Sequence, residues 1–600
     1  MDSPGGQRVW ILANRLATWA RWKGTLLGDL LVRGGEVIDG RGAPPRRADL
    51  RVCAGRITEI GIDLKPEGER QVDAGGAFVT PGFIDGHTHV DPALWWDPGC
   101  DPLPSHGVTT VVTGNCSLSL APLKKENRAS LTDMFCFIED LPNEAFEAGI
   151  PWSWETWPEY RRAFDARGAA VQVAPLVGHS ALRLHVIGEE SYERASTEAE
   201  RKAIAALMRE CLTAGAFGLS TSFLDTDRAG RPVPSRAADD DEFRALVGEM
   251  AAMGRGVFEF VPRLMQLETQ MEDIERVHSL CRGAGVPATW TQLYIGDHNA
   301  DHIEPLLAQA TRTQLEGPGV FPQVSPRPFD VNLSFDQTAV FMAMPAWNEI
   351  VSVGADGKRQ RLEDREWRKR ARAEWDDGQP SLFPKDRPDR VVFSGVTRPE
   401  LESFIGMNLA DYAASREQHP SDALADWVLA NDLSPQITLA DTAYAPERVA
   451  ELLSHPATVC AASDAGAHVQ MMCGGGDTSL LLERYVRERA DFPVEEAIRR
   501  MTSEVAMLFG IHDRGILEVG YAGDLAVFSL DEIRWAPETF VSDLPGGHSR
   551  ITRPAGGIRA TVVAGVPTHL DGQSTGATPG RMLEPRRGPK RAAASTSAGE

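Results

Sequence analysis

The chain has 600 residues, of which 42% are hydrophobic and 24% are charged, and it carries a net charge of −23 at pH 7. These fractions are typical of a globular protein and exclude a fully disordered chain, a collagen-like repeat and a coiled coil. The acidic balance repels nucleic acids and anionic membranes, so we expect neither as a partner.

The N-terminal region and the cysteines indicate where the protein works. The apolar run Val9–Ala13 stops at Asn14 and is too short for a secretory signal, so residues 1–28 are predicted to be an N-terminal extension. No apolar run reaches the roughly 18 residues that a membrane-spanning helix needs. The eight cysteines form no Cys-x-x-Cys pair, which favours a reducing, cytoplasmic location over a disulfide scaffold.

Two segments near the chain ends share a pattern of short strands separated by Gly and Pro turns. They are residues 29–80, with LLVRGGEVID and ADLRVCAGRITEIG, and residues 511–572, with GILEVGYAGDLAVF and IRATVVAGVPTH. Such runs are typical of a small all-β unit, and we predict one β-sandwich built from both segments. Residues 573–600 are small, basic and poor in apolar side chains, and are predicted to be a disordered tail.

The long middle, residues 81–510, alternates short apolar strands with helical stretches. This alternation predicts parallel βα units, and eight or nine such units favour an α/β fold of the (β/α)8 TIM-barrel type. An open doubly wound sheet is the alternative, although no Gly-x-Gly-x-x-Gly motif opens a helix after the first strand. Residues 359–390 are dense in charge and are predicted to be a solvated insertion.

The strongest local motif is a His-x-His pair at the end of the first predicted barrel strand, in PGFIDGHTH at 81–89. Residues i and i+2 of a strand face the same side, so His87 and His89 can reach one metal ion. Neutral imidazole suits zinc and similar divalent ions. Two solvent-facing histidines are the alternative, but barrel active sites lie at this end of the strands.

A second motif lies near the other end of the barrel, where the apolar strand TVCAA runs into Asp464. The first and last strands of a closed barrel are neighbours, so we expect Asp464 to meet His87 and His89 at one rim. A carboxylate beside a metal-activated water can ligate the metal and also accept the proton of the water. Capping of the following helix is the alternative role of Asp464.

Taken as an ordered set, these segments resemble the amidohydrolase superfamily and, within it, the D-aminoacylase (N-acyl-D-amino-acid deacylase) branch. The resemblance covers roughly residues 29–570, and implies a metal-dependent barrel with a flanking β-sandwich that hydrolyses an amide bond. The residues that carry it include PGFIDGHTH at 81–89, GVTTVVTGNCSLSLAPL at 107–123, LVGHSALR at 176–183, GAFGLSTSF at 215–223 and SDAGAH at 463–468.

The resemblance implies roles for individual residues. His87 and His89 match the ligand pair of the first strand, Asp464 matches the ligand and base of the last strand, and Cys116 matches the cysteine ligand of D-aminoacylases. Many amidohydrolases bridge two metals with a lysine, but the only lysine between Lys125 and Lys358 is one in a polar helical segment. Cys116 is therefore the best candidate for a bridge, and an inert buried cysteine is the alternative.

The chain departs from the family at two strands that should each deliver a histidine. We assign the fifth and sixth strands to residues 287–297 and 319–330, which contain no histidine and carry Gln292 and Gln323 at about the expected places. We therefore expect one zinc ion, held by His87, His89 and Asp464 with Cys116 as a further candidate ligand, and doubt a tightly held second metal.

Candidate substrate contacts follow other predicted strands. His179 ends the third strand and is a candidate catalytic group that polarises the scissile carbonyl, with a structural role equally open. A substrate carboxylate is usually bound by arginine. The candidates are Arg183, Arg263 and Arg327, which all follow predicted strand ends, and Tyr294, which closes the predicted fifth strand. Surface ion pairing is expected for at least two of the three arginines.

Together these features predict a metal-dependent hydrolase of a linear amide, with Asp464 as general base and a small-molecule N-acyl-D-amino acid as substrate. One alternative is a cyclic amide hydrolase of the dihydroorotase or hydantoinase type, which usually needs the bridging lysine. Another is a non-catalytic scaffold with the same fold. The sequence leaves a homo-oligomer open.

Overall fold

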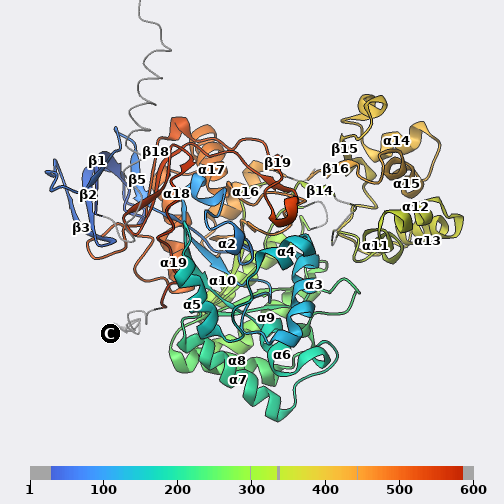
Figure 1. The fold of residues 1–600 in the computed structure, drawn as a ribbon, viewed down its shortest axis with the longest axis horizontal. Coiled ribbons are helices and arrows are strands. Elements are labelled where there is room, and N and C mark those ends of the chain that lie inside the picture. Colours follow the sequence, from blue (N-terminus) through green and yellow to red (C-terminus); the bar gives the residue numbers. More distant parts are fainter. Residues whose placement is uncertain are drawn as a thin grey trace, which may run out of the picture.

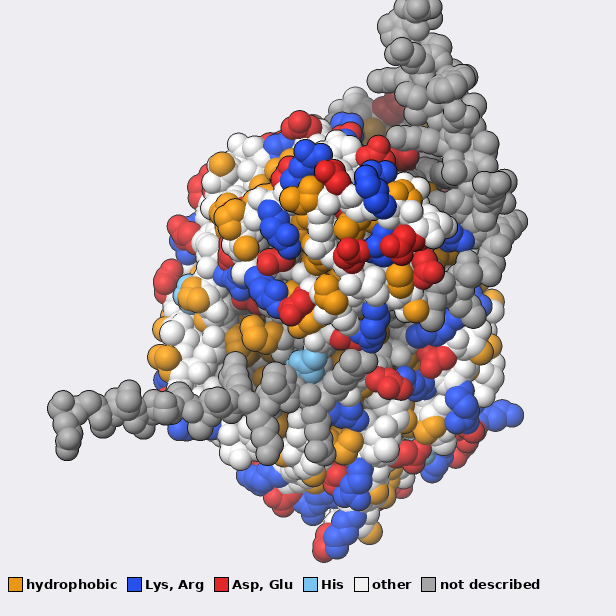
Figure 2. All heavy atoms as spheres, turned by 90° about the vertical axis from the view of Figure 1, so that its left-hand side faces the viewer, with side chains coloured by type: hydrophobic (Ala, Val, Ile, Leu, Met, Phe, Trp, Pro, Cys, Tyr) orange, Lys and Arg blue, Asp and Glu red, His pale blue; other side chains and the backbone are white. Residues whose placement is uncertain are grey.

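The computed structural model describes residues 29–296, 299–333, 335, 338, 340–441 and 444–585 (Figure 1). The predicted N-terminal extension lies outside the described residues, as do residues 586–600 of the predicted tail. Among the described helices, none combines the length and apolar character that crossing a membrane requires. Figure 2 shows the face that carries the first strands, on which acidic and basic side chains are interspersed.

One mixed sheet draws its strands from both ends of the described chain. Its order is β23-β22-β21-β18-β5-β1-β2-β3, with β4 beside β1. Strands β5 and β18 pair antiparallel at its centre, with Val79 opposite Val527. The strands are β1 (Leu30–Val37), β2 (Arg46–Cys53), β3 (Arg56–Gly61), β4 (Arg70–Asp73), β5 (Phe78–Pro81), β18 (Leu525–Phe528), β21 (Ile558–Val563), β22 (Val566–Leu570) and β23 (Gln573–Ser574).

A series of parallel strands forms the centre of the α/β part. Strands β6, β7 and β8 pair in one sheet and β9, β10, β11, β12, β13 and β17 in another, and only Leu176 separates β8 from β9. The strands are almost entirely buried, as expected when helices cover a parallel sheet. Their bounds are β6 (Phe83–Asp85), β7 (Val108–Thr113), β8 (Gln172–Pro175), β9 (Val177–Gly178), β10 (Gly218–Ser222), β11 (Val257–Val261), β12 (Ala288–Trp290), β13 (Val320–Val324) and β17 (Val459–Cys460).

Helices connect these strands, and local sequence signals mark their ends. A capping box of Thr197 and Glu200 begins α7, and Gly254 ends α8 with a left-handed φ of 64°. The helices are α2 (Ala93–Trp96), α3 (Arg128–Ile138), α4 (Asn143–Gly149), α5 (Trp157–Arg167), α6 (His179–Val186), α7 (Glu198–Thr213), α8 (Asp240–Met253), α9 (Leu267–Arg282), α10 (Ile303–Glu316), α16 (Pro446–Ser454), α17 (Asp477–Leu480), α18 (Val494–Met501) and α19 (Ser503–Phe509).

The strand count from the sequence was wrong by one position. Since β8 and β9 occupy one place, β11 is the fifth parallel strand, and the segments assigned as fifth and sixth hold the sixth and seventh places as β12 and β13. The fifth place therefore presents Glu259, at the centre of the run VFEFV. The apolar run at Val391 has the composition of a central strand but belongs to a separate sheet.

That sheet is part of an outer lobe, which we define as residues 331–439, inserted between β13 and β17. Figure 1 shows the lobe to one side of the rest of the molecule. A three-stranded antiparallel sheet, β14-β16-β15, lies at its base. The elements are β14 (Val331–Leu333), α11 (Pro345–Val351), α12 (Ala355–Glu363), α13 (Arg365–Trp375), β15 (Val391–Gly395), α14 (Leu409–Ser415), α15 (Pro420–Ala430) and β16 (Gln436–Leu439).

Residues 359–390 belong to this inserted lobe, but they are more than a solvated excursion, because helix α13 contributes to the core of the lobe. Helix α13 buries Trp367, Ala371 and Trp375 and exposes most of its charged residues. Positions i, i+4 and i+8 lie on one helix face, so a charge-rich helix can still contribute to a core. The buried side chains join Trp347 and Trp427 in a hydrophobic core separate from that of the parallel strands.

The predicted disordered tail also needs correction over the residues that the structure describes. Residues 573–574 form β23, and Gly580 and Met582 form isolated β-bridges to Ala169 and Val173. Met582 is buried against the core of the parallel strands. Averaging the composition over 28 residues hid this apolar anchor.

We expect Trp427→Ala to destabilise the outer lobe by about 3–5 kcal/mol, because it removes a fully buried aromatic side chain. Trp427 stacks on Phe393 with ring centroids 3.9 Å apart. Urea unfolding followed by circular dichroism measures the change, and Leu382→Ala, at an exposed position of the same lobe, is the control. Equal unfolding midpoints for the two variants would contradict a packed lobe core.

Candidate metal centre

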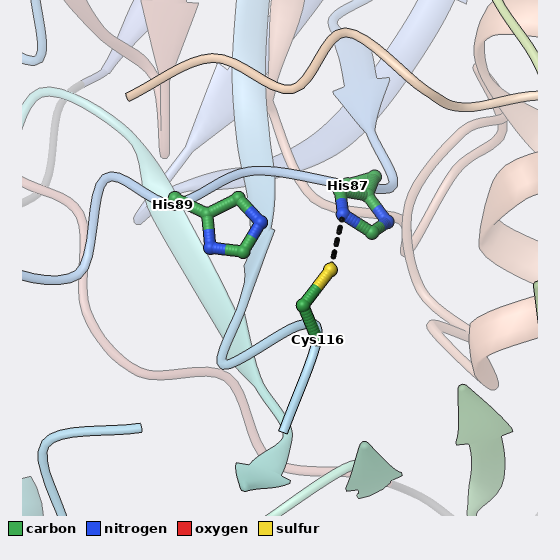
Figure 3. Close-up of side chains that lie close together, drawn as sticks. All are labelled: His87, His89 and Cys116. Carbon is green, nitrogen blue, oxygen red and sulfur yellow. Dashed lines mark hydrogen bonds between the residues drawn. The ribbon is translucent and has the colours of Figure 1, made fainter. Parts of the chain in front are cut away.

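Three potential metal ligands converge at the carboxyl ends of two neighbouring strands. His87 and His89 follow β6, and Cys116 follows β7, its parallel neighbour. The Nε2 atom of His87 lies 3.3 Å from the Cys116 Sγ. Each of the three residues offers one ligand atom, and these atoms all lie within 4.8 Å of one another. Figure 3 shows the sulfur directed at His87, with the ring of His89 beside it.

Asp464 completes this group from the last parallel strand. Its Oδ1 lies 3.5 Å from Nε2 of His89 and 3.8 Å from Nε2 of His87. Backbone hydrogen bonds hold the segments together, since Asp464 N donates to His87 O at 3.0 Å and His89 N donates to Ala465 O at 2.8 Å. The structure thus brings together all four residues predicted as metal ligands.

The chemistry of the four side chains fits a metal ion. Burial lowers the pKa of both imidazoles, that of His89 to about 3, so the rings are in the neutral, metal-binding form at pH 7. Burial also raises the pKa of the Cys116 thiol well above its usual value, and a coordinated metal would deprotonate it. Two imidazoles, a thiol and a carboxylate are donors that zinc prefers.

The ionisation of Asp464 is set by opposing effects. Burial disfavours the charged form, but the adjacent imidazoles and the guanidinium of Arg327 hold the pKa of its carboxyl below the usual value. Asp464 is therefore a carboxylate at neutral pH, as required of a ligand or a proton acceptor.

Two further acids, which the sequence analysis missed, lie against the histidines. Glu139 follows α3, and its Oε1 lies 3.1 Å from Nδ1 of His89. Glu259 accepts a hydrogen bond from Cys116 N at 3.0 Å, and its other oxygen lies 3.9 Å from Nδ1 of His87. A carboxylate on the outer nitrogen of a ligand histidine fixes the orientation of the ring.

Only one of these acids had a signal in the sequence. Glu259 is a charged residue at the centre of the apolar strand VFEFV, where a buried charge demands a partner. Glu139 follows the apolar end of a helix, a common place for a surface residue, so nothing nearby distinguishes it.

The structure places His179 and Arg183 in a different environment from the one expected. Nε2 of His179 lies 2.7 Å from Glu242 Oε1, and its Nδ1 lies 3.1 Å from Thr221 Oγ1. Arg183 donates to the other oxygen of Glu242 at 2.6 Å. Since His179 begins α6 instead of ending a strand, both side chains turn toward α8. Both ring nitrogens of His179 have hydrogen-bond partners and the charge of Arg183 is paired with Glu242, so neither side chain faces the metal ligands as a catalytic or substrate-binding group would.

The remaining substrate candidates lie in two different places, one on the surface and two in a cavity. Arg263 makes two hydrogen bonds of 2.9 and 2.8 Å to Asp273 and is 43% exposed. It thus forms a surface ion pair, which was the alternative to substrate binding for this arginine. Tyr294 and Arg327 line one cavity of about 370 Å³, including the part open to solvent, together with Gln292. The structure thus brings together Tyr294 and Arg327.

A larger cavity lies beside the segments that follow two of the ligands. Its volume is about 690 Å³, including the part open to solvent. Val90, next to His89, and Ala465, next to Asp464, contribute to a lining that is mainly apolar, and Arg550 at its edge is paired with Asp543.

Comparison with known proteins gives the class of this chain. Residues 70–345 and 408–569 match the model of the amidohydrolase family, and the stretch between these two ranges lies within the outer lobe. A D-aminoacylase from Alcaligenes xylosoxydans xylosoxydans is 30% identical over 573 residues, covering 92% of this chain and 97% of the relative. The chain therefore belongs to the amidohydrolase family, and it is an enzyme that hydrolyses carbon–nitrogen bonds other than peptide bonds.

Solved structures place the chain near particular members of that family. A crystal structure of D-aminoacylase matches with a TM-score of 0.65 and 26% identity, covering 93% of this chain and all of the other. N-acyl-D-glutamate deacylase from Bordetella bronchiseptica, complexed with zinc and a phosphonate inhibitor that mimics the tetrahedral intermediate, matches with a TM-score of 0.61 and 25% identity over the same shares. The resemblance to the D-aminoacylase branch is confirmed, and the scaffold alternative is set aside.

We expect Glu139→Gln to weaken metal binding about 10- to 100-fold, because it replaces the carboxyl group that lies 3.1 Å from the outer nitrogen of the His89 ring. Competition against a chromophoric chelator measures the affinity of the substrate-free protein. Glu144→Gln, on the exposed side of α4, is the matched control. Unchanged affinity in Glu139→Gln would show that Glu139 does not orient His89.

Proposed function

We propose that this enzyme hydrolyses the linear amide bond of N-acyl-D-amino acids with one zinc ion held by His87, His89, Cys116 and Asp464. The observation that carries the proposal is the convergence of these four donors from the first, second and last parallel strands. The donor types support zinc, as does the zinc in the N-acyl-D-glutamate deacylase structure. The D-aminoacylase relatives support the substrate class.

The residues divide the chemical work. A zinc ion at this site supplies Lewis-acid activation of the carbonyl and of the attacking water. His87 and His89 present unprotonated Nε2 atoms because burial keeps their rings neutral. Asp464 has a side chain that is 20% exposed, so its carboxylate can accept the proton of the water and return it to the leaving nitrogen.

The two cavities suggest how the substrate is divided. The larger one, with its mainly apolar lining beside Val90 and Ala465, suits an apolar acyl group or side chain. The smaller one offers the phenol of Tyr294 and the amide of Gln292, which can hydrogen-bond a polar end of the substrate. The scissile amide would then lie between them, beside Asp464.

For the fold, the proposal includes a closed (β/α)8 barrel flanked by a β-sandwich from both chain ends. Eight parallel strand positions pair in sequence order, and an isolated parallel bridge joins Thr88 to Ala465, just beyond the first and last strands. That bridge and the neighbouring backbone hydrogen bonds support closure.

We expect Asp464→Asn to abolish amine release while the protein retains metal, because Asn cannot accept the proton and three donors remain. Metal analysis and a colorimetric amine assay measure the two properties. Asp356→Asn, on the exposed side of the outer lobe, is the control. Near-normal turnover in Asp464→Asn would overturn the assignment of the base.

The substrate class is tested by comparing N-acetyl-D-amino acids, their L-enantiomers and cyclic amides such as hydantoins, each with and without added zinc. The proposal predicts zinc-dependent hydrolysis of the D-enantiomers in preference to the others. Faster hydrolysis of the cyclic amides would favour the hydantoinase type of chemistry instead.

A further inference from the structure

Arg327 is the one arginine among the three substrate candidates that lies at the rim of the proposed site. It follows β13 in the run Ser325-Pro326-Arg327-Pro328, where the chain leaves the parallel strands for the outer lobe. The flanking prolines restrict the backbone. Pro326 O also accepts a hydrogen bond from Tyr485 Oη at 2.8 Å. The guanidinium is therefore presented from an anchored segment.

The polar atoms of the Arg327 side chain are turned toward the protein. Its Nη2 donates to Ser463 O at 2.8 Å, and its Nη1 donates to the Met472 Sδ at 3.1 Å. Its Nε lies 3.5 Å from Asp477 Oδ1, and the side chain is only 6% exposed. Arg327 thus contacts both ends of the loop 463–472, which carries Asp464. Its charge is balanced by the buried carboxylate of Asp477.

The bond to Ser463 O acts directly on the geometry of the proposed base. Ser463 C=O and Asp464 N–H belong to one peptide plane, and the N–H donates to His87 O at 3.0 Å. The plane is therefore held at both edges, by Arg327 and by the first-strand segment. The orientation of this plane relative to the Asp464 Cα is the φ angle of Asp464, which is 58° and left-handed. Non-glycine residues keep such a φ only when their surroundings impose it.

The other side of Ser463 is held as well. Its hydroxyl donates to Asp85 Oδ2 at 2.5 Å, and Ala465 N donates to the same hydroxyl at 3.1 Å. Asp85 belongs to the first parallel strand, whereas Arg327 follows the seventh. Loop 463–472 is thus held from the strands on both of its sides, and Arg327 supplies the contacts on the side of the outer lobe.

We propose that Arg327 is a positioning residue, which fixes the peptide plane before Asp464 and so aims its carboxylate at the metal ligands, and that it does not bind the carboxylate of the substrate. This inference rests on the proposed function, because Asp464 is taken as ligand and base. A substrate-binding arginine would instead act on anionic substrates alone, and would leave the substrate-free centre unchanged.

Two readouts separate these roles in Arg327→Gln and Arg327→Lys. The first readout is kcat and KM, determined separately for N-acetyl-D-leucine and for its carboxamide by following the release of acetate. A positioning role predicts that Arg327→Gln lowers kcat about 100-fold for both substrates, as expected for a reacting group displaced by about 1 Å, with KM nearly unchanged and partial rescue by lysine. The second is the visible spectrum of the cobalt(II)-loaded, substrate-free protein, which should shift when the aim of Asp464 changes.

The controls cover folding and the proposed function itself. Arg209→Gln removes an arginine that pairs with Glu249 between α7 and α8 and should leave both readouts unchanged, and thermal melting checks each variant. A loss confined to the acid substrate as a higher KM, with an unchanged cobalt spectrum, would overturn the inference, as would wild-type behaviour throughout. The proposed function fails if the wild-type protein hydrolyses neither substrate, or if Asp464→Asn leaves the cobalt spectrum unchanged. In that case the cobalt spectrum of Arg327→Gln still decides whether Arg327 acts on the metal centre.

Discussion

The contact between the segments that follow the first and last parallel strands is the constraint on which the site depends. Asp464 N donates to His87 O, and His89 N donates to Ala465 O. These two backbone hydrogen bonds join positions almost 400 residues apart in the sequence. They set the register of the two segments, and with it the 3.5 Å approach of the Asp464 carboxylate to the His89 ring. A change of register at this seam between the two segments would therefore move Asp464 away from the histidines.

The electrostatics around this seam favour a bound cation. Asp85, Asp91, Glu139 and Glu259 are buried, and the side chain of Asp464 is 20% exposed. Burial raises the pKa of Asp85 to about 8 and that of Asp91 to about 7. A buried carboxylate is costly unless a positive charge or a proton balances it. Burial alone favours the protonated form of these carboxyl groups, and a divalent ion on the histidines would stabilise their ionised form. The acidic net charge of the chain and the acidic groups around the site both disfavour an anionic substrate. The metal and local hydrogen bonds must therefore supply the attraction that binds it.

Much of the α/β architecture was predictable, because apolar runs ending in polar residues mark buried parallel strands. His87, His89 and Asp464 were predictable for the same reason, since each comes shortly after such a run. Cys116 was predicted from the resemblance to D-aminoacylases. The count of strands was not, because the run at Val391 in the outer lobe has the same composition as a central strand. The contact of Glu139 with His89 and the ion-pair partners of Arg183 and Arg263 could not be predicted from the sequence either. Those contacts join residues on different elements, and their side-chain directions depend on packing that no local pattern encodes. His179 was misplaced for a related reason, since one residue decides whether it ends a strand or begins a helix.

The central claim is that one metal ion on His87, His89, Cys116 and Asp464 carries the hydrolysis. The most direct test removes the metal with a chelator and returns zinc in steps, while the hydrolysis of an N-acetyl-D-amino acid is followed. The account predicts that activity is lost in the apoprotein and rises linearly to a plateau at one equivalent of zinc, and that this recovery disappears in His87→Ala. Full activity in the metal-free protein, or a plateau reached only at two equivalents, would contradict it.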